Sequence, residues 1–358
     1  MRVRNFCAGP AVIPEAVLEE VKSELLAWGD SGMSIMEMSH RSSIFDEVAM
    51  TAKKDFIDLM SVPDDYDVLF LQGGATQQFS MIPMNFSSKT ESADYLLSGT
   101  WSKKAISEGL KFSNINVVAS SEEGNFTSAP EIETWNLDSK AKYFHYAPNE
   151  TIQGVAIHNP PEIDSPIIAD MSSVILSEPI DVSKFSLIYA GAQKNMGPAG
   201  TTLVIVKEEI LGKVTRHIPT MLNYQAHIAK ESMANTPAVF AVYVSMLNLQ
   251  WLKDIGGISF IEEVNNKKAA LLYAEIDRNP LFKGIVAKED RSTMNATFNL
   301  TDPALAAPFD ALWKVAGING LNGHRSVGGY RASMYNALPL HSVQVLVDVM
   351  QALENEQA

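Results

Sequence analysis

The sequence predicts an α/β fold: a mainly parallel sheet of the seven-stranded type sandwiched by helices, followed by a smaller α+β domain. Three observations lead to this fold class. Short β-branched runs alternate with helical patterns through the first two-thirds of the 358 residues. These runs are continuously apolar, which is typical of parallel strands covered on both faces. Beyond about residue 258 the character changes, and the first extended run there alternates in polarity.

Seven runs are the predicted strands of the large sheet. The first, 67–72, ends in the Gly73-Gly74 turn, and a helix is expected from about Ala75. The others are 94–98, 115–119, 142–146, 166–169, 185–190 and 201–206. Helix-like segments separate these runs, which indicates parallel pairing with helices on both faces of the sheet.

Two long helices are predicted next, over 237–255 and 258–278. The second helix is amphipathic, and its apolar positions include Ile258, Ile261 and Leu272. Its expected polar face carries the charged side chains of Glu262, Glu263, Lys267 and Lys268.

The remaining tail mixes strands and helices. Residues 293–300 are predicted to form a half-buried strand, 308–316 a helix, 327–334 an extended segment and 342–353 a closing helix. The length favours about two domains. We therefore predict a large domain over 16–257 and a small domain over 258–358 that also includes 1–15.

Composition excludes several classes of function. The formal net charge is −14, which argues against nucleic acid or an anionic membrane as a partner. Residues 232–252 carry no charge, but Asn235, Pro237 and Asn248 interrupt them, so a buried helix is expected there rather than a membrane span. An anionic ligand would need a local cationic pocket in so acidic a protein.

The cysteines and histidines limit the possible metal sites, disulfides and cellular compartment. Cys7 is the single cysteine, so no intrachain disulfide or thiolate zinc site is possible and a reducing compartment is expected. The seven histidines include no His-x-x-x-His pair, so no metal site is predicted. The first residues lack the apolar core of a secretory signal. A cytoplasmic protein is expected.

Lys194 is the most informative residue. It follows the apolar run 185–190 and lies among small residues before a Gly-Pro turn. An ammonium is costly to desolvate, so a lysine at this place suits a functional role, such as forming a Schiff base with a carbonyl compound. Pyridoxal phosphate is the commonest such partner. Taken alone, the segment fits a solvated loop lysine beside a turn better than a reactive one.

Asp170 makes the functional interpretation of Lys194 more specific. It ends the predicted strand 166–169, and open α/β sheets bind ligands at the carboxyl ends of their strands. A lone aspartate there is also a common helix cap. Asp170 and Lys194 could lie on neighbouring strand ends, and a pyridoxal ring needs both groups: a lysine for the aldehyde and a carboxylate for the ring nitrogen.

Three further features could complete such a site. The Gly73-Gly74 turn opens a helix whose backbone N–H groups could hold a phosphate, although glycine pairs are common in such turns. It matches neither nucleotide-binding glycine motif. Trp101 could stack on a planar ring or line the core. Thr151 could hydrogen-bond a phenolate or phosphate oxygen, or simply occupy a turn.

Two His-Arg pairs could supply the cationic pocket. They are His40-Arg41 and His324-Arg325, and Arg331 follows the second pair. Arginine grips carboxylate or phosphate through two parallel hydrogen bonds, so these residues suit a substrate with two anionic groups. The alternative is ordinary surface salt bridges to the abundant acids.

Together these motifs resemble the phosphoserine aminotransferases, a family of class V, fold-type I pyridoxal-phosphate enzymes. The resemblance extends from Asn5 to the tail. It is carried by Asp170-Met-Ser-Ser, Ala190-Gly-Ala-Gln-Lys-Asn-Met-Gly-Pro-Ala-Gly200, Asn235-Thr236-Pro237 and Gly323-His-Arg-Ser-Val-Gly-Gly-Tyr-Arg-Ala-Ser333. It implies transamination between L-glutamate and 3-phosphohydroxypyruvate. A role in pyridoxal-phosphate synthesis is a further possibility.

The resemblance also implies a role for each matching residue. Lys194 and Asp170 would be catalytic and would bind the cofactor. The other implied cofactor contacts are Ala75, Thr76, Trp101, Thr151, Gln193, Asn235 and Thr236, the last two from the second subunit of a homodimer. The implied substrate contacts are His40, Arg41, His324, Arg325 and Arg331.

One departure and two rival activities stay open. Some family members carry an arginine where this chain has Thr76, so the group that binds the substrate phosphate is undecided, and the His-Arg pairs are the expected substitute. Another class V enzyme, such as an alanine- or serine-glyoxylate aminotransferase, would not explain those pairs. A non-catalytic binding protein on the same fold would not need Lys194 and Asp170.

Overall fold

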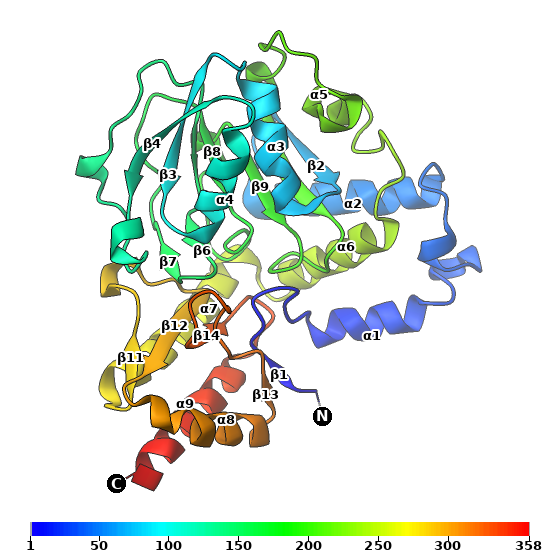
Figure 1. Cartoon of the computed structure of the whole chain (residues 1–358). Coiled ribbons are helices and arrows are strands. Elements are labelled where there is room, and N and C mark those ends of the chain that lie inside the picture. The colour runs from blue at the N-terminus through cyan, green and yellow to red at the C-terminus, as the bar shows by residue number, and fades with distance from the viewer. Residues whose placement is uncertain (1, 358) are drawn as a thin grey trace.

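The computed structural model describes residues 2–357 and confirms the predicted fold class (Figure 1). A seven-stranded sheet has the order β2-β10-β9-β8-β5-β3-β4. Its strands are β2 (Tyr66–Leu71), β3 (Ser92–Leu97), β4 (Asn114–Ser120), β5 (Phe144–Tyr146), β8 (Ile167–Asp170), β9 (Leu187–Gly191) and β10 (Thr202–Lys207). Each predicted strand is present, shifted by at most three residues at either end.

Only β10 runs against its neighbours in this sheet. The reason is its connection: the short segment 192–201 turns the chain straight back from β9 to β10, and Ala192 N–H bonds the carbonyl of Thr201. A connection of that length cannot hold a crossover helix, so the two strands must pair antiparallel. This hairpin carries Lys194.

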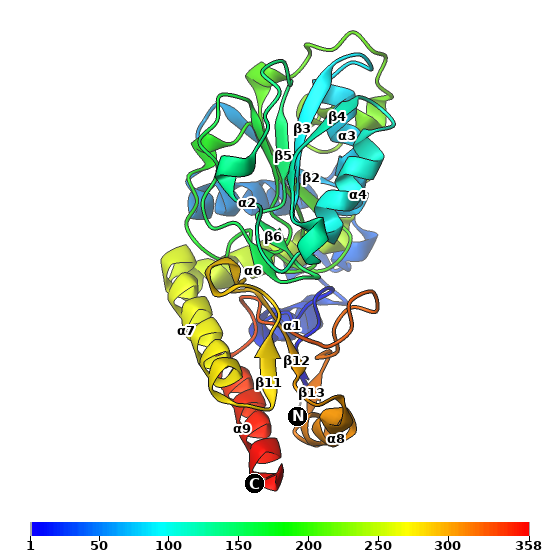
Figure 2. The same ribbon diagram turned by 60° about the vertical axis from the view of Figure 1, so that its left-hand side comes forward.

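Helices cover both faces of the sheet (Figures 1 and 2). On one face lie α1 (Glu15–Glu24), α2 (Ser43–Met60) and α6 (Val239–Asp254), and on the other α3 (Gly74–Phe86), α4 (Thr100–Gly109) and α5 (Tyr224–Ile228). Alternate strand residues enter the two cores: Val68 and Phe70 join the first and Leu69 and Leu71 the second. Burial on both faces explains why the strands are continuously apolar.

The C-terminal part has a core of its own. Its helices are α7 (Gly257–Arg278), α8 (Ala306–Val315) and α9 (Leu340–Gln357), and its sheet pairs β11 (Phe282–Gly284), β12 (Asn295–Leu300) and β14 (Tyr330–Ser333). The N-terminal strand β1 (Arg4–Asn5) pairs with β13 (Ile318–Asn319), and Phe6 enters the same core. We propose the domain boundaries 16–257 and 258–358 with 1–15, which these separate cores support.

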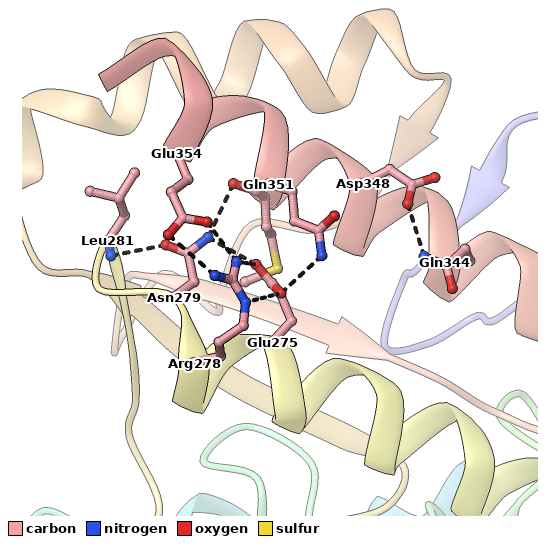
Figure 3. A network of polar contacts seen from close by, with 9 residues as sticks. Glu275, Arg278, Asn279, Leu281, Gln344, Asp348, Gln351 and Glu354 are labelled. Carbon is pink, nitrogen blue, oxygen red and sulfur yellow. Dashed lines mark hydrogen bonds and ion pairs between the residues drawn. The ribbon is translucent and has the colours of Figure 1, made fainter. Parts of the chain in front are cut away.

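Polar contacts join α7 to α9 (Figure 3). The buried carboxylate of Glu275 accepts hydrogen bonds from Arg278 at 2.8 Å, from Asn279 at 2.9 Å and from Gln351 at 3.2 Å. Arg278 also donates to Glu354 at 2.6 Å. The two helices are therefore held together by matched charges as well as by apolar packing.

Three expectations for the small domain need correction. Residues 295–298 are buried on both faces rather than half-buried, because the polar side of β12 packs on the large domain, where Thr297 donates to the carbonyl of Gln153. The extended segment 327–334 contains strand only over Tyr330–Ser333, because Gly328 and Gly329 adopt positive φ. Lys268 is fully buried instead of lying on the polar face of α7.

The uncharged segment behaves as expected. Helix α6 is buried for most of its length between the sheet and its neighbours. Within residues 2–357 no helix combines the length and apolar character that a membrane crossing would need.

Candidate active site

A cavity of about 110 Å³ lies at the carboxyl ends of the central strands. It is lined by Gly74, Ala75, Thr76, Trp101, Asn149, Thr151, Asp170, Ser172, Ser173, Gln193 and Lys194. Seven residues predicted from the sequence therefore meet here: Ala75, Thr76, Trp101, Thr151, Asp170, Gln193 and Lys194. They come from five separate segments of the chain.

Lys194 lies at the centre of this group. Its Nζ donates to the hydroxyl of Thr151 at 2.6 Å and lies 5.8 Å from the ring centroid of Trp101. Burial lowers the pKa of Lys194 to about 8, although the carboxylates of Asp170 and Glu150 oppose the shift. About one Lys194 in ten is then neutral at pH 7, against about one free lysine in 2,500.

The hairpin that carries Lys194 is fixed by its neighbour Asn195. The Asn195 amide donates to the carbonyl of Ile175, and its own oxygen accepts the backbone N–H of Asn336. Gly197 lets the hairpin pack closely on α6, since an added Cβ there would lie 2.5 Å from the Ser245 hydroxyl oxygen. The position of Lys194 therefore depends on both domains.

Asp170 is the last residue of β8 and lines the cavity. Its carboxylate accepts hydrogen bonds from the Ser172 hydroxyl at 2.6 Å and the Ser172 N–H at 3.0 Å. Burial raises the pKa of Asp170, while Lys194, Ser172 and Tyr189 lower it. A buried carboxylate beside a lysine is suited to holding a positively charged ring nitrogen.

Two helices begin at the cavity, and only one of them is capped. At α4 the carboxylate of Glu150 accepts the N–H groups of Trp101 at 2.8 Å and Ser102 at 2.7 Å. At α3 no side chain caps the first turn, and Gly73 and Gly74 have φ of 93° and 68°. The N-terminus of α3 is therefore the one left open for an anion such as a phosphate.

One hairpin positions both Trp101 and Thr151. It is formed by β6 (Asn149–Glu150) and β7 (Val155–Ala156). Glu150 binds the start of α4, where Trp101 lies, and the next residue, Thr151, contacts Lys194. Gly99 leaves room for this contact, because a Cβ there would lie 2.4 Å from the Glu150 carboxyl carbon. Glu150 therefore fixes two walls of the cavity at once.

The second His-Arg motif lies near the cavity. Arg331 donates to the carbonyl of Thr151 at 3.1 Å, and its charge lowers the pKa of Lys194. His324 is exposed, and desolvation together with Arg331, Lys104 and Arg325 lowers its pKa. Lys104 also lies 4.3 Å from the Trp101 ring centroid. These groups form the local cationic patch that an anionic ligand needs.

The motif arginines do not form surface salt bridges. Among residues 2–357, Arg41, Arg325 and Arg331 have no carboxylate partner, whereas Arg278 and Arg291 each have one. The alternative of ordinary ion pairs is therefore wrong for these three. In addition, the Nε atoms of Arg331 and Trp101 are buried without a partner in the described part of the chain.

Four predicted residues are not brought to the cavity within one chain. Half-buried His40 and exposed Arg41 lie in a turn before α2, and Asn235 and Thr236 lie in an exposed segment before α6. Thr236 is tied only to the end of β2, where its carbonyl accepts the Gln72 amide at 2.5 Å. None of these four side chains lines the cavity in the described chain.

Several site residues were missed by sequence reasoning. Ser172 and Ser173 belong to the Asp170-Met-Ser-Ser motif, so their position next to Asp170 is a signal that could have found them. Glu150 and Lys104 offered no signal, because their roles depend on which helix start or ring lies beside them in the fold.

A sequence model of the aminotransferase class-V family matches residues 3–346. The chain is 55% identical to phosphoserine aminotransferase of Flavobacterium johnsoniae, over 99% of this chain and 100% of that protein. It is 49% identical to phosphoserine aminotransferase of Bacillus cereus, over 99% of each protein.

Solved structures give the same result. Phosphoserine aminotransferase from Bacillus circulans subsp. alkalophilus superposes with a TM-score of 0.97 at 42% identity, over 100% of this chain and 99% of that one. The pyridoxal-phosphate-bound enzyme from Trichomonas vaginalis gives 0.94 at 38% identity, over 98% and 100%. An alanine-glyoxylate aminotransferase from Nostoc gives 0.74 at 14% identity, over 99% and 95%, which shows a shared fold alone.

Proposed function

The chain belongs to the class-V aminotransferase family and is a pyridoxal-phosphate-dependent transaminase, and we propose that its substrates are L-glutamate and 3-phosphohydroxypyruvate. The products are 2-oxoglutarate and O-phospho-L-serine. The observation that supports the proposal best is the meeting of Lys194 and Asp170 at one cavity beneath an uncapped helix start.

The cavity residues suit pyridoxal phosphate group by group. Lys194 would bond the aldehyde carbon, Asp170 would hold the ring nitrogen, and Trp101 would cover the ring. Thr151 offers a hydroxyl for the ring oxygen. The first N–H groups of α3, at Ala75 and Thr76, with Gln193 nearby, would take the phosphate. Bound there, the cofactor supplies an electron-poor ring that accepts an electron pair from the substrate's α-carbon.

Lys194 is the proposed proton carrier. When not bonded to the cofactor, the Lys194 amine would lie free within the cavity, beside Thr151. A pKa lowered to about 8 keeps a useful fraction of it neutral, so it can accept the α-proton and return it elsewhere. Burial raises the pKa of Asp170, while Lys194 and Ser172 lower it and so favour the charged carboxylate that would hold a protonated ring nitrogen.

The cationic patch accounts for a phosphorylated substrate. The charge of Arg331 lowers the pKa of Lys194, and Arg331 is proposed to bind the substrate carboxylate, together with Arg41. The pairs His40-Arg41 and His324-Arg325 are proposed to bind the phosphate in place of an arginine at position 76. None of these arginines has an acidic partner within the described residues, so each is available to an anion.

A second copy of the chain is proposed to complete the site. Asn235 and Thr236 are exposed in one chain, and a partner cavity would use them as phosphate ligands. The segment 25–50 also exposes large apolar side chains, with Leu26 86%, Met36 55% and Met50 52% accessible. Apolar exposure on this scale suits burial in a homodimer. A cytoplasmic location is proposed from the lone unpaired Cys7.

Three alternatives are compared, the first two by the charge of the substrate. Alanine or serine with glyoxylate would leave the His-Arg pairs without a ligand. A phosphorylated hydroxythreonine, the substrate in pyridoxal-phosphate synthesis, would fit the same patch. A non-catalytic role would not need Lys194 and Asp170 to meet at one cavity.

Steady-state rates with four oxo acids test the proposal. We expect kcat/KM for 3-phosphohydroxypyruvate to exceed that for unphosphorylated hydroxypyruvate by at least about a hundredfold, since each lost charged hydrogen bond costs about 1.5–3 kcal/mol. Pyruvate and glyoxylate serve as controls for size. A preference for glyoxylate would overturn the substrate assignment.

A further inference from the structure

A line of polar side chains lies in the sheet behind Asp170. In a parallel sheet, directly opposed residues point to the same face. The register aligns Asp170 of β8 with Tyr189 of β9, and aligns His145 of β5 with Ile168, two residues before Asp170. His145 and Tyr189 therefore flank β8 from its two sides, on the face that carries Asp170.

The two flanking residues meet across β8. His145 Nε2 lies 2.9 Å from the Tyr189 hydroxyl, and both side chains are buried. The imidazole also stacks on Tyr95 at 4.7 Å between ring centroids, with 26° between the planes. The stack fixes the plane of the imidazole and hence the direction of its hydrogen bond to Tyr189.

The proton on His145 has one suitable position. Burial lowers the pKa of His145 to about 3, so the ring is neutral and carries a single N–H. Nδ1 has no partner among the described residues, whereas Nε2 faces the Tyr189 oxygen. A buried N–H without an acceptor is costly, so we assign the proton to Nε2. The Tyr189 oxygen then accepts, and its own O–H is free to donate.

We propose that Tyr189 and His145 are positioning residues, in which His145 donates to Tyr189 and Tyr189 donates to the Asp170 carboxylate, keeping that carboxylate charged and correctly oriented. The inference rests on the proposed function, in which Asp170 holds the cofactor's ring nitrogen. The other charged groups near Asp170 are Lys194, which stabilises its charge, and Glu150, which repels it. Within residues 2–357, the hydroxyl and the backbone N–H of Ser172 also donate to Asp170.

A pair of tyrosine variants tests the proposal. Tyr189→Phe removes the hydroxyl and keeps the ring. Tyr95→Phe is the matched control, because its hydroxyl bonds only Tyr143, at 2.8 Å, while its ring keeps the stack on His145. The measurement is the dissociation constant of pyridoxal phosphate from each apoprotein, followed by tryptophan fluorescence from pH 5 to 8, with the melting temperature of each apoprotein alongside.

We expect Tyr189→Phe to weaken cofactor binding roughly tenfold at neutral pH. The acid limb, which is the pH range in which affinity falls as the solution becomes more acidic, should move up by about one pH unit. The sign follows because losing a donor disfavours the charged carboxylate and so raises the pKa of Asp170. Tyr95→Phe should stay within about twofold of the wild type. His145→Phe, which keeps a stacked ring, should shift the acid limb in the same direction by less.

Equal affinities and acid limbs for Tyr189→Phe and Tyr95→Phe would overturn the proposal. If Tyr189→Phe does not fold, His145→Phe decides in its place, and an acid limb identical to the wild type overturns the proposal. Wild-type apoprotein that binds no pyridoxal phosphate at any pH would instead refute the proposed function, before any variant is compared.

Discussion

Lys194 at the cavity and Lys268 on α7 are both lysines whose pKa is lowered by burial, to about 8 and about 7. Their surroundings differ in every other respect. Lys194 makes one hydrogen bond, to a hydroxyl, and borders a cavity with a carboxylate. Lys268 is fully buried and donates to three backbone carbonyls, those of Met334, Tyr335 and Leu338.

The difference teaches that a perturbed lysine is not by itself a reactive one. All three N–H donors of Lys268 are satisfied, and no carbonyl compound can reach it. It holds the segment after β14 against α7 and so supports the position of Arg331. Lys194 keeps donors to spare beside an open space. Unused N–H donors beside an open cavity, more than a lowered pKa, therefore distinguish a reactive lysine from a structural one.

The largest effect is expected from Lys194→Ala. Removing the amine takes away both the bond to the aldehyde and the proton carrier, so turnover with glutamate should fall by at least about a thousandfold. The melting temperature should change little, because the side chain makes a single hydrogen bond. Turnover within tenfold of the wild type would contradict the assigned role.

Lys268→Met should damage stability rather than chemistry. Three buried carbonyls lose their donor, so the free energy of unfolding in urea should fall by about 3 kcal/mol. Lys267→Met is the matched control, because the Lys267 side chain is 64% exposed. This substitution should lower the free energy of unfolding by less than about 0.5 kcal/mol. Equal losses in the two variants would remove the structural role given to Lys268.

Glu150→Gln should loosen the cavity without unfolding the protein. One carboxylate oxygen becomes an amide NH₂ that cannot accept the N–H of Trp101 or Ser102, so pyridoxal-phosphate affinity should fall about tenfold. Glu122→Gln, at an exposed ion pair with Lys103, is the control. Unchanged affinity for Glu150→Gln would show that the cap does not position Trp101.

The smallest effect is expected at the rim of the cavity. Arg325→Ala should raise the KM for 3-phosphohydroxypyruvate about three- to tenfold and leave the KM for glutamate unchanged, because an exposed charge is partly screened by water and salt. Arg2→Ala removes an equally positive charge beside Glu15 and serves as the control. An equal rise of KM for both substrates would contradict a phosphate-specific role.

Much of the fold and the centre of the site could be predicted from the sequence. Continuous apolar runs marked the strands, and strand ends placed Asp170 and Lys194 at one edge. Lys268 could not be predicted, because helical periodicity assigned it to a polar face and only the tertiary fold supplies its three carbonyls. Glu150 and His145 were missed for the same reason, since their partners are distant in sequence.

Competitive acetylation of the apoprotein from pH 6 to 11 would sharpen the comparison. Only the neutral amine reacts, so Lys194 should be half-reactive near pH 8, well below the pH of about 10.5 for an exposed lysine. Lys268 should stay unlabelled at every pH despite its low pKa, because no part of it is exposed. Faster acetylation of Lys268 than of Lys194 would contradict the claim that Lys194 is the accessible lysine of the two.

Borohydride trapping tests the central claim most directly. The protein loaded with pyridoxal phosphate is reduced, digested and mapped by mass spectrometry, which locates the lysine joined to the cofactor. The account predicts the label on the peptide that carries Lys194, and no label there in Lys194→Ala. A label on Lys268, or on any lysine outside the cavity, would contradict it.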